Sequence, residues 1–422
     1  MPAESDRRSI PVYIPMILAA LAIRLAVIPF VYGEWMQPYF VEHWDQGNVA
    51  RALLAGRGFG SPFPVDMPST IMPPVYCCIV AAIFWMFGIH TVASIIAALS
   101  LNCLFSALAC IPVYLIAQRS FGDRTAKWAT WGWAFSPYGI YFAAEWAWST
   151  HLLLLLLYWL LYLAQDMERS DRPKLWLGFG LLSGFAALTE PVALSVVPFL
   201  IALSAWRLRE RGKAWLMPAG VAVLALLATL SPWFIRNYVT FHRFIPMRGS
   251  MGLQLYLGNH GESLHWVHVE HHPNHDPAEL EAYRQMGEMA YMDHKLQQAV
   301  SYISAHPGWY AWMSFRRAVY LWTGYWSFDR AYLAEEPLDP PNVFLATAMS
   351  LLAMFGLIKA FRSARAEAIR YAGVLFFLPF MYYFVHPNAY YMRPLDPLIL
   401  ILGVYGILHR SQAVPPESIR PA

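Results

Sequence analysis

Charged residues are scarce in this sequence. They make up 14% of its 422 residues, and hydrophobic residues make up 58%. In soluble domains, roughly a quarter of the residues are charged. This composition excludes an ordinary water-soluble fold. The net charge is only +3, so binding of nucleic acid has no electrostatic support.

Cysteine is also rare. The four cysteines, Cys77, Cys78, Cys103 and Cys110, all lie inside apolar stretches, which is not the pattern of a disulfide framework. No internal repeat and no separable soluble segment is apparent. We therefore expect residues 1–422 to form a single membrane domain.

Apolar runs are abundant. The first, Ile10 to Tyr32, follows Arg7 and Arg8 and is longer than the apolar region of a signal peptide, so we interpret it as an uncleaved first span. A helix needs roughly 20 apolar residues to cross a bilayer. Further apolar runs of about this length lie at 91–118, 127–144, 148–165, 175–189, 191–206, 214–232, 341–359, 371–386 and 396–409. The sequence predicts an all-α polytopic membrane protein with about ten transmembrane helices.

The segment 71–87 decides the topology. It is short and begins at a Pro-Pro pair, so it could cross the membrane or lie half-embedded in it. If it does not cross, the basic loops near 119–127, 169–174, 207–213 and 359–370 and both tails face the cytoplasm, as the positive-inside rule requires. We therefore predict a half-embedded helix, a cytoplasmic N-terminus and a location in the cell inner (plasma) membrane.

This topology leaves two large regions outside the cytoplasm, 33–90 and 233–340. In the second, Asp276–Glu279 has the pattern of a helix start, with an Asp cap and Pro at the first position. Apolar residues recur behind it at three- and four-residue steps, which indicates an amphipathic helix. The segment Trp309–Trp326 is typical of a helix at a membrane interface.

Asp45 is the acidic residue of most interest in the first external loop. A short helix is expected from Asn48 to Leu54, which would place Asp45 at its N-terminal edge. A carboxylate there is stabilised as an anion and could act as a general base. It could equally be only a helix cap.

Several motifs, in order, resemble those of bacterial family 39 glycosyltransferases. These belong to the GT-C superfamily, with the protein O-mannosyltransferases and the lipid A aminoarabinose transferase. The segments that carry the resemblance are Ala52–Phe59, Pro73–Tyr76, Ala117–Gly122, Gly184–Pro191, Pro232–Tyr238 and Tyr391–Pro397.

The resemblance implies a GT-C-like helical bundle and assigns the catalytic base to Asp45. It also implies a second acid at the outer end of a span, which matches Glu145; acids close to the membrane are costly unless they are used. Glu42, Glu190, His386 and Tyr391 are possible acceptor-side or auxiliary residues.

The implied reaction moves a sugar from a polyprenyl phosphate, such as undecaprenyl phosphate, to an extracytoplasmic glycan, lipid or protein. Transfer in one displacement would invert the anomeric centre. The leaving phosphate needs cations, and the external candidates are Arg51, Arg57, Arg236 and Arg393. Each could instead only snorkel toward lipid headgroups, and Arg24 in the first span could do either.

A divalent metal is a possible cofactor. Six histidines crowd residues 260–275, and His265 and His268 have a spacing that a metal could use. No cysteine lies nearby, and prolines divide the segment, so a solvated loop is the favoured interpretation.

Two other functions compete with the transferase. Proline-interrupted helices, as at Thr189–Pro191, suit a transporter or flippase, although the ionisable residues gather at one face and no two-fold symmetry appears. A non-catalytic scaffold in envelope-glycan assembly is the other alternative.

Overall fold

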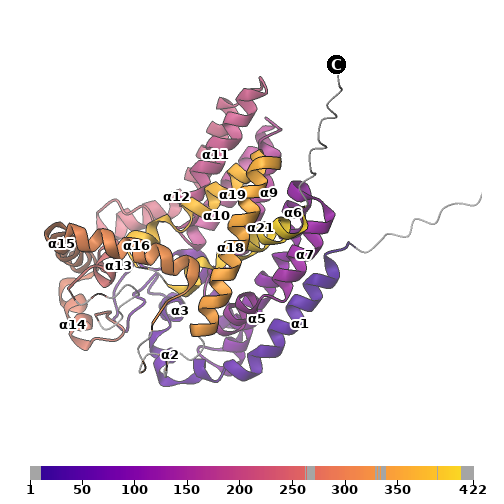
Figure 1. Cartoon of the computed structure of the whole chain (residues 1–422). Coiled ribbons are helices and arrows are strands. Elements are labelled where there is room, and N and C mark those ends of the chain that lie inside the picture. The colour runs from indigo at the N-terminus through magenta and orange to yellow at the C-terminus, as the bar shows by residue number, and fades with distance from the viewer. Residues whose placement is uncertain are drawn as a thin grey trace, which may run out of the picture.

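The structure is a computed structural model that describes residues 11–261, 263, 271–327, 330, 333, 339–386 and 388–409. Its regular elements are helices (Figure 1), and among the described residues a single isolated bridge between Gly60 and Pro68 is the only β pairing. The predicted all-α class is confirmed.

The chain from the first span to the large external region forms α1 to α12. Their bounds are α1 Ile14–Val31, α2 Pro38–His43, α3 Asp45–Leu54, α4 Pro74–Phe87, α5 Val92–Leu108, α6 Cys110–Phe121, α7 Asp123–Ala134, α8 Pro137–Glu145, α9 Thr150–Met167, α10 Pro173–Thr189, α11 Ala193–Glu210 and α12 Leu216–Phe241. The 3-10 turn η1 covers Glu34–Met36.

The remaining helices form the external region and the last spans. Their bounds are α13 Met251–Gly258, α14 Pro277–Met286, α15 Glu288–Ala305, α16 Pro307–Thr323, α18 Asp339–Ser363, α19 Arg365–Phe377, α20 Phe380–Phe384, the 3-10 turn η2 Ala389–Leu395, and α21 Asp396–Leu408.

Six helical stretches in the described part of the chain are long and apolar enough to cross a membrane. They are Ile14–Val31, Val92–Phe121, Thr150–Met167, Leu216–Phe241, Pro340–Ser363 and Tyr390–Leu408. The other predicted spans correspond to shorter or more charged helices, so the figure of ten crossings stays a prediction. The protein is nevertheless a multi-pass membrane protein by its fold.

One predicted span is divided. The run 127–144 forms two helices, α7 and α8, because Pro137 starts a new helix and the Ser136 hydroxyl caps it by accepting a hydrogen bond from the Gly139 amide at 3.3 Å. The segment 71–87 forms α4, whose 14 residues extend roughly 21 Å. That length is short of the ~30 Å hydrocarbon core.

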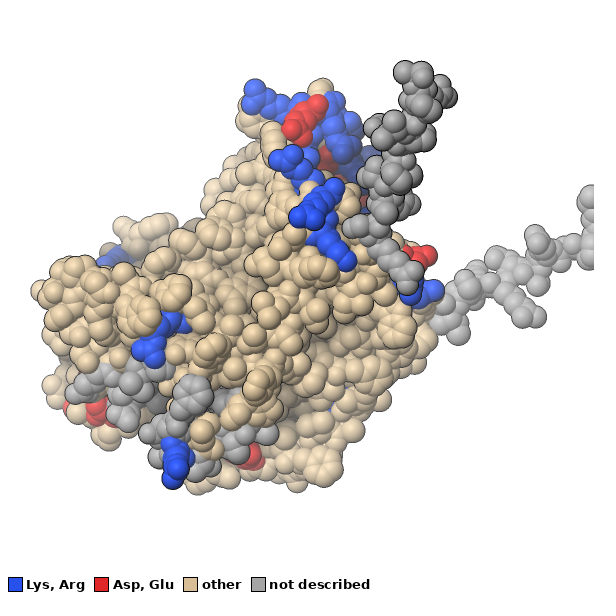
Figure 2. Space-filling model, viewed as in Figure 1, with Lys and Arg blue, Asp and Glu red and all other residues tan. Residues whose placement is uncertain are grey.

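Basic loops meet at one end of the bundle. Arg119 pairs with Asp166 at 2.9 Å, Arg370 pairs with the buried Glu168 at 2.7 Å, and the Lys213 ammonium donates to the Arg169 carbonyl. Figure 2 shows lysines and arginines gathered at this end, above α9, α11 and α19. The loops predicted to be cytoplasmic therefore do share one end.

The opposite end carries the acidic and aromatic residues of interest. Helix α9 runs from Thr150 at this end to Met167 at the basic end, roughly 27 Å away. Helices α13 to α16 lie here beside α3 (Figure 1), and an apolar cluster joins Val49 of α3, Cys77 of α4, Leu253 of α13 and Tyr283 of α14. The predicted helix start at Asp276 is confirmed, since its carboxylate accepts from the Ala278 amide at 2.8 Å.

Candidate active site

Asp45 is the first residue of α3. The residue before it, Trp44, occupies the cap position, and no side chain caps this helix, so Asp45 is not a helix cap. The Trp44 indole is buried and donates to the Ala147 carbonyl at 3.1 Å. A Cβ on Gly47 would lie 2.6 Å from that indole, so glycine is needed for the close packing that fixes Asp45.

The Asp45 carboxylate has a hydrogen-bond partner that lies 229 residues later in the chain. The Asn274 side-chain amide donates to Asp45 Oδ1 at 3.1 Å. The Asn274 backbone amide bonds His272 Nδ1 at 3.2 Å, and the neighbouring His275 ring bonds the Tyr39 hydroxyl of α2 at 3.2 Å. The turn that precedes α14 is thereby held against the start of α3.

Removal from water raises the pKa of Asp45 to about 7, and the Asn274 hydrogen bond and the charge of Arg248 offset part of this rise. Burial disfavours the charged form of a carboxyl group. A carboxylate that gains its proton near neutral pH is suited to take and give up protons there.

Arg248 is the cation of this site. Its Nη1 lies 3.5 Å from Glu190 Oε2, and its charge also reaches Asp45 and Tyr391. Among the described residues, its buried Nε has no hydrogen-bond partner. An arginine with an unused donor can donate a hydrogen bond to an anion.

The segment that carries Arg248 is fixed on both sides. The Trp233 indole of α12 donates to the Met247 carbonyl at 2.9 Å, and the Gly249 amide donates to the Thr70 hydroxyl at 3.1 Å. Thr70 in turn donates to the buried carboxylate of Glu288 on α15. The first external loop, α12 and α15 therefore hold Arg248 in place together.

Glu190 closes the site at the end of α10. Its Oε1 accepts a hydrogen bond from the Ser149 hydroxyl at 2.5 Å, while its Oε2 faces Arg248. His386 bonds Gln254 of α13 at 2.6 Å, and its ring centroid lies 6.0 Å from that of Tyr391. Of the predicted auxiliary residues, Glu190 pairs with Arg248, Tyr391 lies within electrostatic reach of Arg248 and Asp45, and His386 lies beside Tyr391.

Glu145 and Glu42 have other neighbours. Burial raises the pKa of Glu145, and the groups that act on it are Tyr141 and Glu34. The Glu42 side chain is exposed, and its backbone carbonyl accepts from Asn48. Among the described residues, neither carboxylate shares a hydrogen bond or an ion pair with Asp45.

The four predicted arginines are engaged elsewhere. Arg51 donates to Asn48, and Arg57 pairs with Asp66 at the surface, 2.5 Å away. Arg236 donates to the backbone carbonyls of Ser69 and Phe59 and thus ties the first external loop to α12.

Arg393 and Arg24 are also held within the bundle. Arg393 lies over the Tyr138 ring and 3.3 Å from Asp396. Arg24 is fully buried and donates to Ser106 and to the carbonyls of Trp133 and Ala134. Sequence patterns did not single out Arg248. Among the described arginines, it is the one whose charge acts on Asp45.

The predicted metal residues His265 and His268 lie outside the described residues. In the described part, His271, Asp276 and Glu279 offer ligand atoms within 4.8 Å of one another. However, Lys295 and Tyr291 donate to the two oxygens of Glu279, at 2.6 and 2.7 Å. A divalent cation would have to displace an ammonium group, so the fit is poor.

Comparison with known proteins gives one family match and several structures with a similar fold. Residues 72–234 match the family model described as dolichyl-phosphate-mannose-protein mannosyltransferase. The fold is similar to that of ArnT from Cupriavidus metallidurans bound to undecaprenyl phosphate, with a TM-score of 0.52 and 14% identity, over 94% of this chain and 60% of that one. The chain therefore shares the fold of this solved protein, and its residues 72–234 resemble the mannosyltransferase family.

Two structures from Archaeoglobus fulgidus share this fold. The oligosaccharyltransferase in the apo form gives a TM-score of 0.53 at 12% identity, over 95% of this chain and 51% of that one. The oligosaccharyltransferase AglB in complex with an inhibitory peptide and a dolichol-phosphate gives a TM-score of 0.50 at 11% identity, over 94% of this chain and 50% of that one. The chain thus spans about half to three fifths of the solved proteins that it resembles. No curated protein matches its sequence.

Proposed function

We propose that this protein is a GT-C glycosyltransferase that transfers a sugar from a polyprenyl phosphate to an acceptor on the extracytoplasmic side of the inner membrane, in the manner of family 39. One observation carries the proposal. A carboxyl group whose pKa is raised to about 7, Asp45, lies within electrostatic reach of an arginine with an unused donor, Arg248, and segments distant in sequence hold both in place.

In the proposed step, Asp45 takes the proton of an acceptor hydroxyl as its oxygen attacks the anomeric carbon. The bond between that carbon and the phosphate oxygen breaks, and the lipid phosphate leaves with the electron pair. Arg248 stabilises the charge that gathers on this phosphate. One base and one displacement give inversion.

Glu190 is proposed to position Arg248. One oxygen of its carboxylate accepts a hydrogen bond from Ser149, and the other oxygen faces the guanidinium, so the carboxylate fixes the orientation of the guanidinium. Glu145 remains proposed as a second acid, since it ends α8 next to the segment that leads into Ser149. His386 and Tyr391 would face the acceptor.

Turnover with defined donors tests the function. Purified full-length protein in lipid nanodiscs is incubated with a panel of undecaprenyl-phosphate sugars and a mixture of envelope glycans and lipids, and release of undecaprenyl phosphate is followed. At least one donor is expected to release lipid phosphate only when acceptor is present. Failure of every donor with every acceptor would remove the proposal.

The activity is expected to depend on pH through Asp45. A base must be deprotonated to accept a proton, so kcat/KM should rise with pH, reach half its maximum near pH 7 and fall about tenfold for each unit below. Asn274→Leu removes a hydrogen bond to the charged form, which should move this limb to higher pH. An acidic limb below pH 5 in both proteins would contradict Asp45 as the base.

A further inference from the structure

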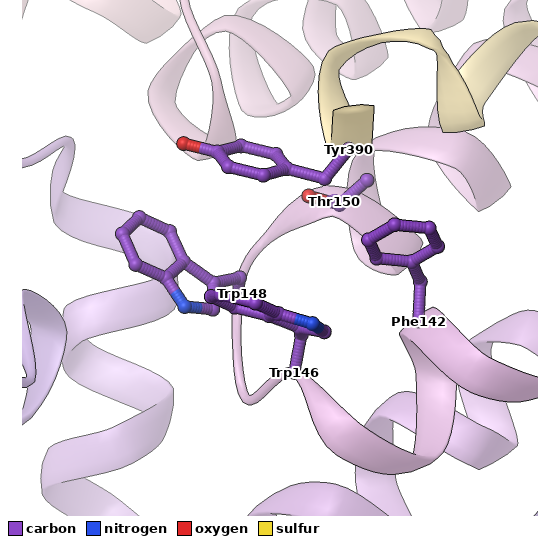
Figure 3. Close-up of a pocket in the computed structure, with 5 residues that line it drawn as sticks. All are labelled: Phe142, Trp146, Trp148, Thr150 and Tyr390. Carbon is purple, nitrogen blue, oxygen red and sulfur yellow. The ribbon is translucent and has the colours of Figure 1, made fainter. Parts of the chain in front are cut away.

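A polar cleft lies at the basic end of the bundle, away from the candidate active site. The aromatic cluster next to that site is closely packed: Trp146, Trp148 and Tyr390 contact one another (Figure 3), and the space that they enclose with Phe142 and Thr150 is too small for a water molecule. The cleft at the basic end, by contrast, has an interior of about 20 Å³ and opens to solvent. That interior holds roughly one water.

The cleft lies between the ends of three helices. Six polar residues of α6, α9, the turn after α9, and α19 line it, namely Arg119, Gln165, Asp166, Arg169, Glu367 and Arg370. Two of the helical stretches that are apolar enough to cross a membrane, Val92–Phe121 and Thr150–Met167, end at this level. Phospholipid headgroups lie where such spans end, and basic pockets between spans bind anionic headgroups.

Two buried side chains in the cleft have polar atoms to spare. Arg370, only 2% exposed, donates from Nε and Nη2 to Glu168 Oε1 at 3.0 and 2.7 Å, whereas its Nη1 has no hydrogen-bond partner among the described residues and lies 4.0 Å from the Glu367 carboxylate. Gln165 donates to the Ser120 hydroxyl at 2.9 Å, and its Oε1 has no hydrogen-bond partner in the same part of the chain. A buried donor and a buried acceptor without partners cost free energy, and a ligand that offers both an acceptor and a donor would satisfy them.

The charges around the cleft are mixed. Two of its three arginines pair with carboxylates, and the third, Arg169, is exposed. The Lys213 ammonium donates to the Arg169 carbonyl at 2.6 Å and adds a further positive charge. Guanidinium donors beside the carboxylate acceptor of Glu367 are complementary to a ligand that combines an anionic phosphate with hydroxyl groups. A bare anion would meet the carboxylates with no donor to offer them.

We propose that this cleft binds the headgroup of an anionic phospholipid that carries free hydroxyls, such as phosphatidylglycerol. One phosphate oxygen enters the interior and accepts a hydrogen bond from Arg370 Nη1, while Arg169 approaches the phosphate at the mouth. A headgroup hydroxyl donates to Gln165 Oε1 or to the Glu367 carboxylate. The rest of the headgroup and the acyl chains stay outside the cleft, since its interior has room for one oxygen only. This lipid site is separate from the proposed sugar transfer and does not depend on it.

Native mass spectrometry measures this binding without turnover. Full-length protein in detergent is titrated with phosphatidylglycerol and with phosphatidylethanol of the same acyl chains, at an ionic strength of about 0.15 M, which screens distant charges. The two lipids carry the same charge, and only phosphatidylglycerol has headgroup hydroxyls. Phosphatidylglycerol is expected to bind roughly three- to tenfold more tightly, the usual effect of one additional hydrogen bond to a charged or buried acceptor.

Arg169→Gln is expected to weaken binding of phosphatidylglycerol roughly five- to tenfold, because the lost cation bonds the phosphate directly. The matched control is Arg172→Gln, the same change at an exposed arginine of the same loop that does not line the cleft. It should weaken binding by less than about twofold, since salt screens a charge that makes no contact with the lipid. Both arginines are exposed, so both variants should fold as the wild type does.

Three results would overturn the lipid site. Equal binding of the two lipids would remove the recognition of the headgroup hydroxyls. Equal losses in Arg169→Gln and Arg172→Gln would reduce the binding to a general attraction between basic loops and anionic lipid. Displacement of phosphatidylglycerol by glycerol 3-phosphate or inorganic phosphate, at concentrations comparable to that of the lipid, would assign the cleft to a soluble phosphate. Because the measurement is of binding alone, failure of the proposed sugar transfer would leave this site standing.

Discussion

Asp45→Asn is expected to lower the rate of sugar transfer by two to four orders of magnitude. An amide cannot take the acceptor's proton, and a positioned general base contributes roughly 10²- to 10⁴-fold. The substitution keeps the shape of the side chain and can still bond Asn274, so the site should otherwise be unchanged. The measurement is single-turnover release of lipid phosphate from the donor identified in the panel.

Asp293→Asn is the matched control for this variant. It makes the same change on α15, where Asp293 is half-exposed and pairs with Arg243, and it should transfer sugar at the wild-type rate. Binding of the donor by Asp45→Asn should also be close to that of wild type, since the donor phosphate does not bind the carboxylate. Transfer by Asp45→Asn within threefold of wild type would remove Asp45 as the base.

Arg248→Met is expected to lower transfer by roughly two to three orders of magnitude, the usual effect of deleting one donor that stabilises developing charge. It should also weaken binding of undecaprenyl phosphate, because Arg248 is the cation proposed to hold the phosphate. No other described arginine shows an electrostatic effect on Asp45. Arg248→Lys should recover part of the rate, since a lysine keeps the charge and loses the planar donor fork. Both quantities can be measured on the same nanodisc preparation.

Arg243→Met serves as the control for Arg248→Met. Arg243 follows the same helix α12, is half-exposed and, within the part of the chain that the structure describes, pairs with Asp293 alone, so its removal should leave transfer and lipid binding intact. If Arg248→Met binds undecaprenyl phosphate as wild type does, the phosphate is held elsewhere. Arg236→Met is uninformative, because Arg236 bonds two carbonyls that anchor the first external loop.

Electrostatics and hydrophobicity made much of this protein predictable from sequence. Apolar runs mark nearly every helix of the bundle, since a helix in lipid must be apolar over its length. The basic loops are predicted on one side, and the contacts of Arg119 and Arg370 place them at one end. The GT-C-like helical fold that the order of short motifs implies is confirmed by the similarity to a solved structure.

The sequence by itself therefore determined the class, the approximate spans and the separation of basic loops from the acids, because these depend on local composition. It also marked Asp45, whose place after the first span is a local feature. Only the tertiary structure brought Asn274, Arg248 and Glu190 to it. These residues lie at the ends of distant elements, where loops can take many paths. Hydrogen bonds made by Trp44, Thr70 and Trp233 select the path that assembles the site.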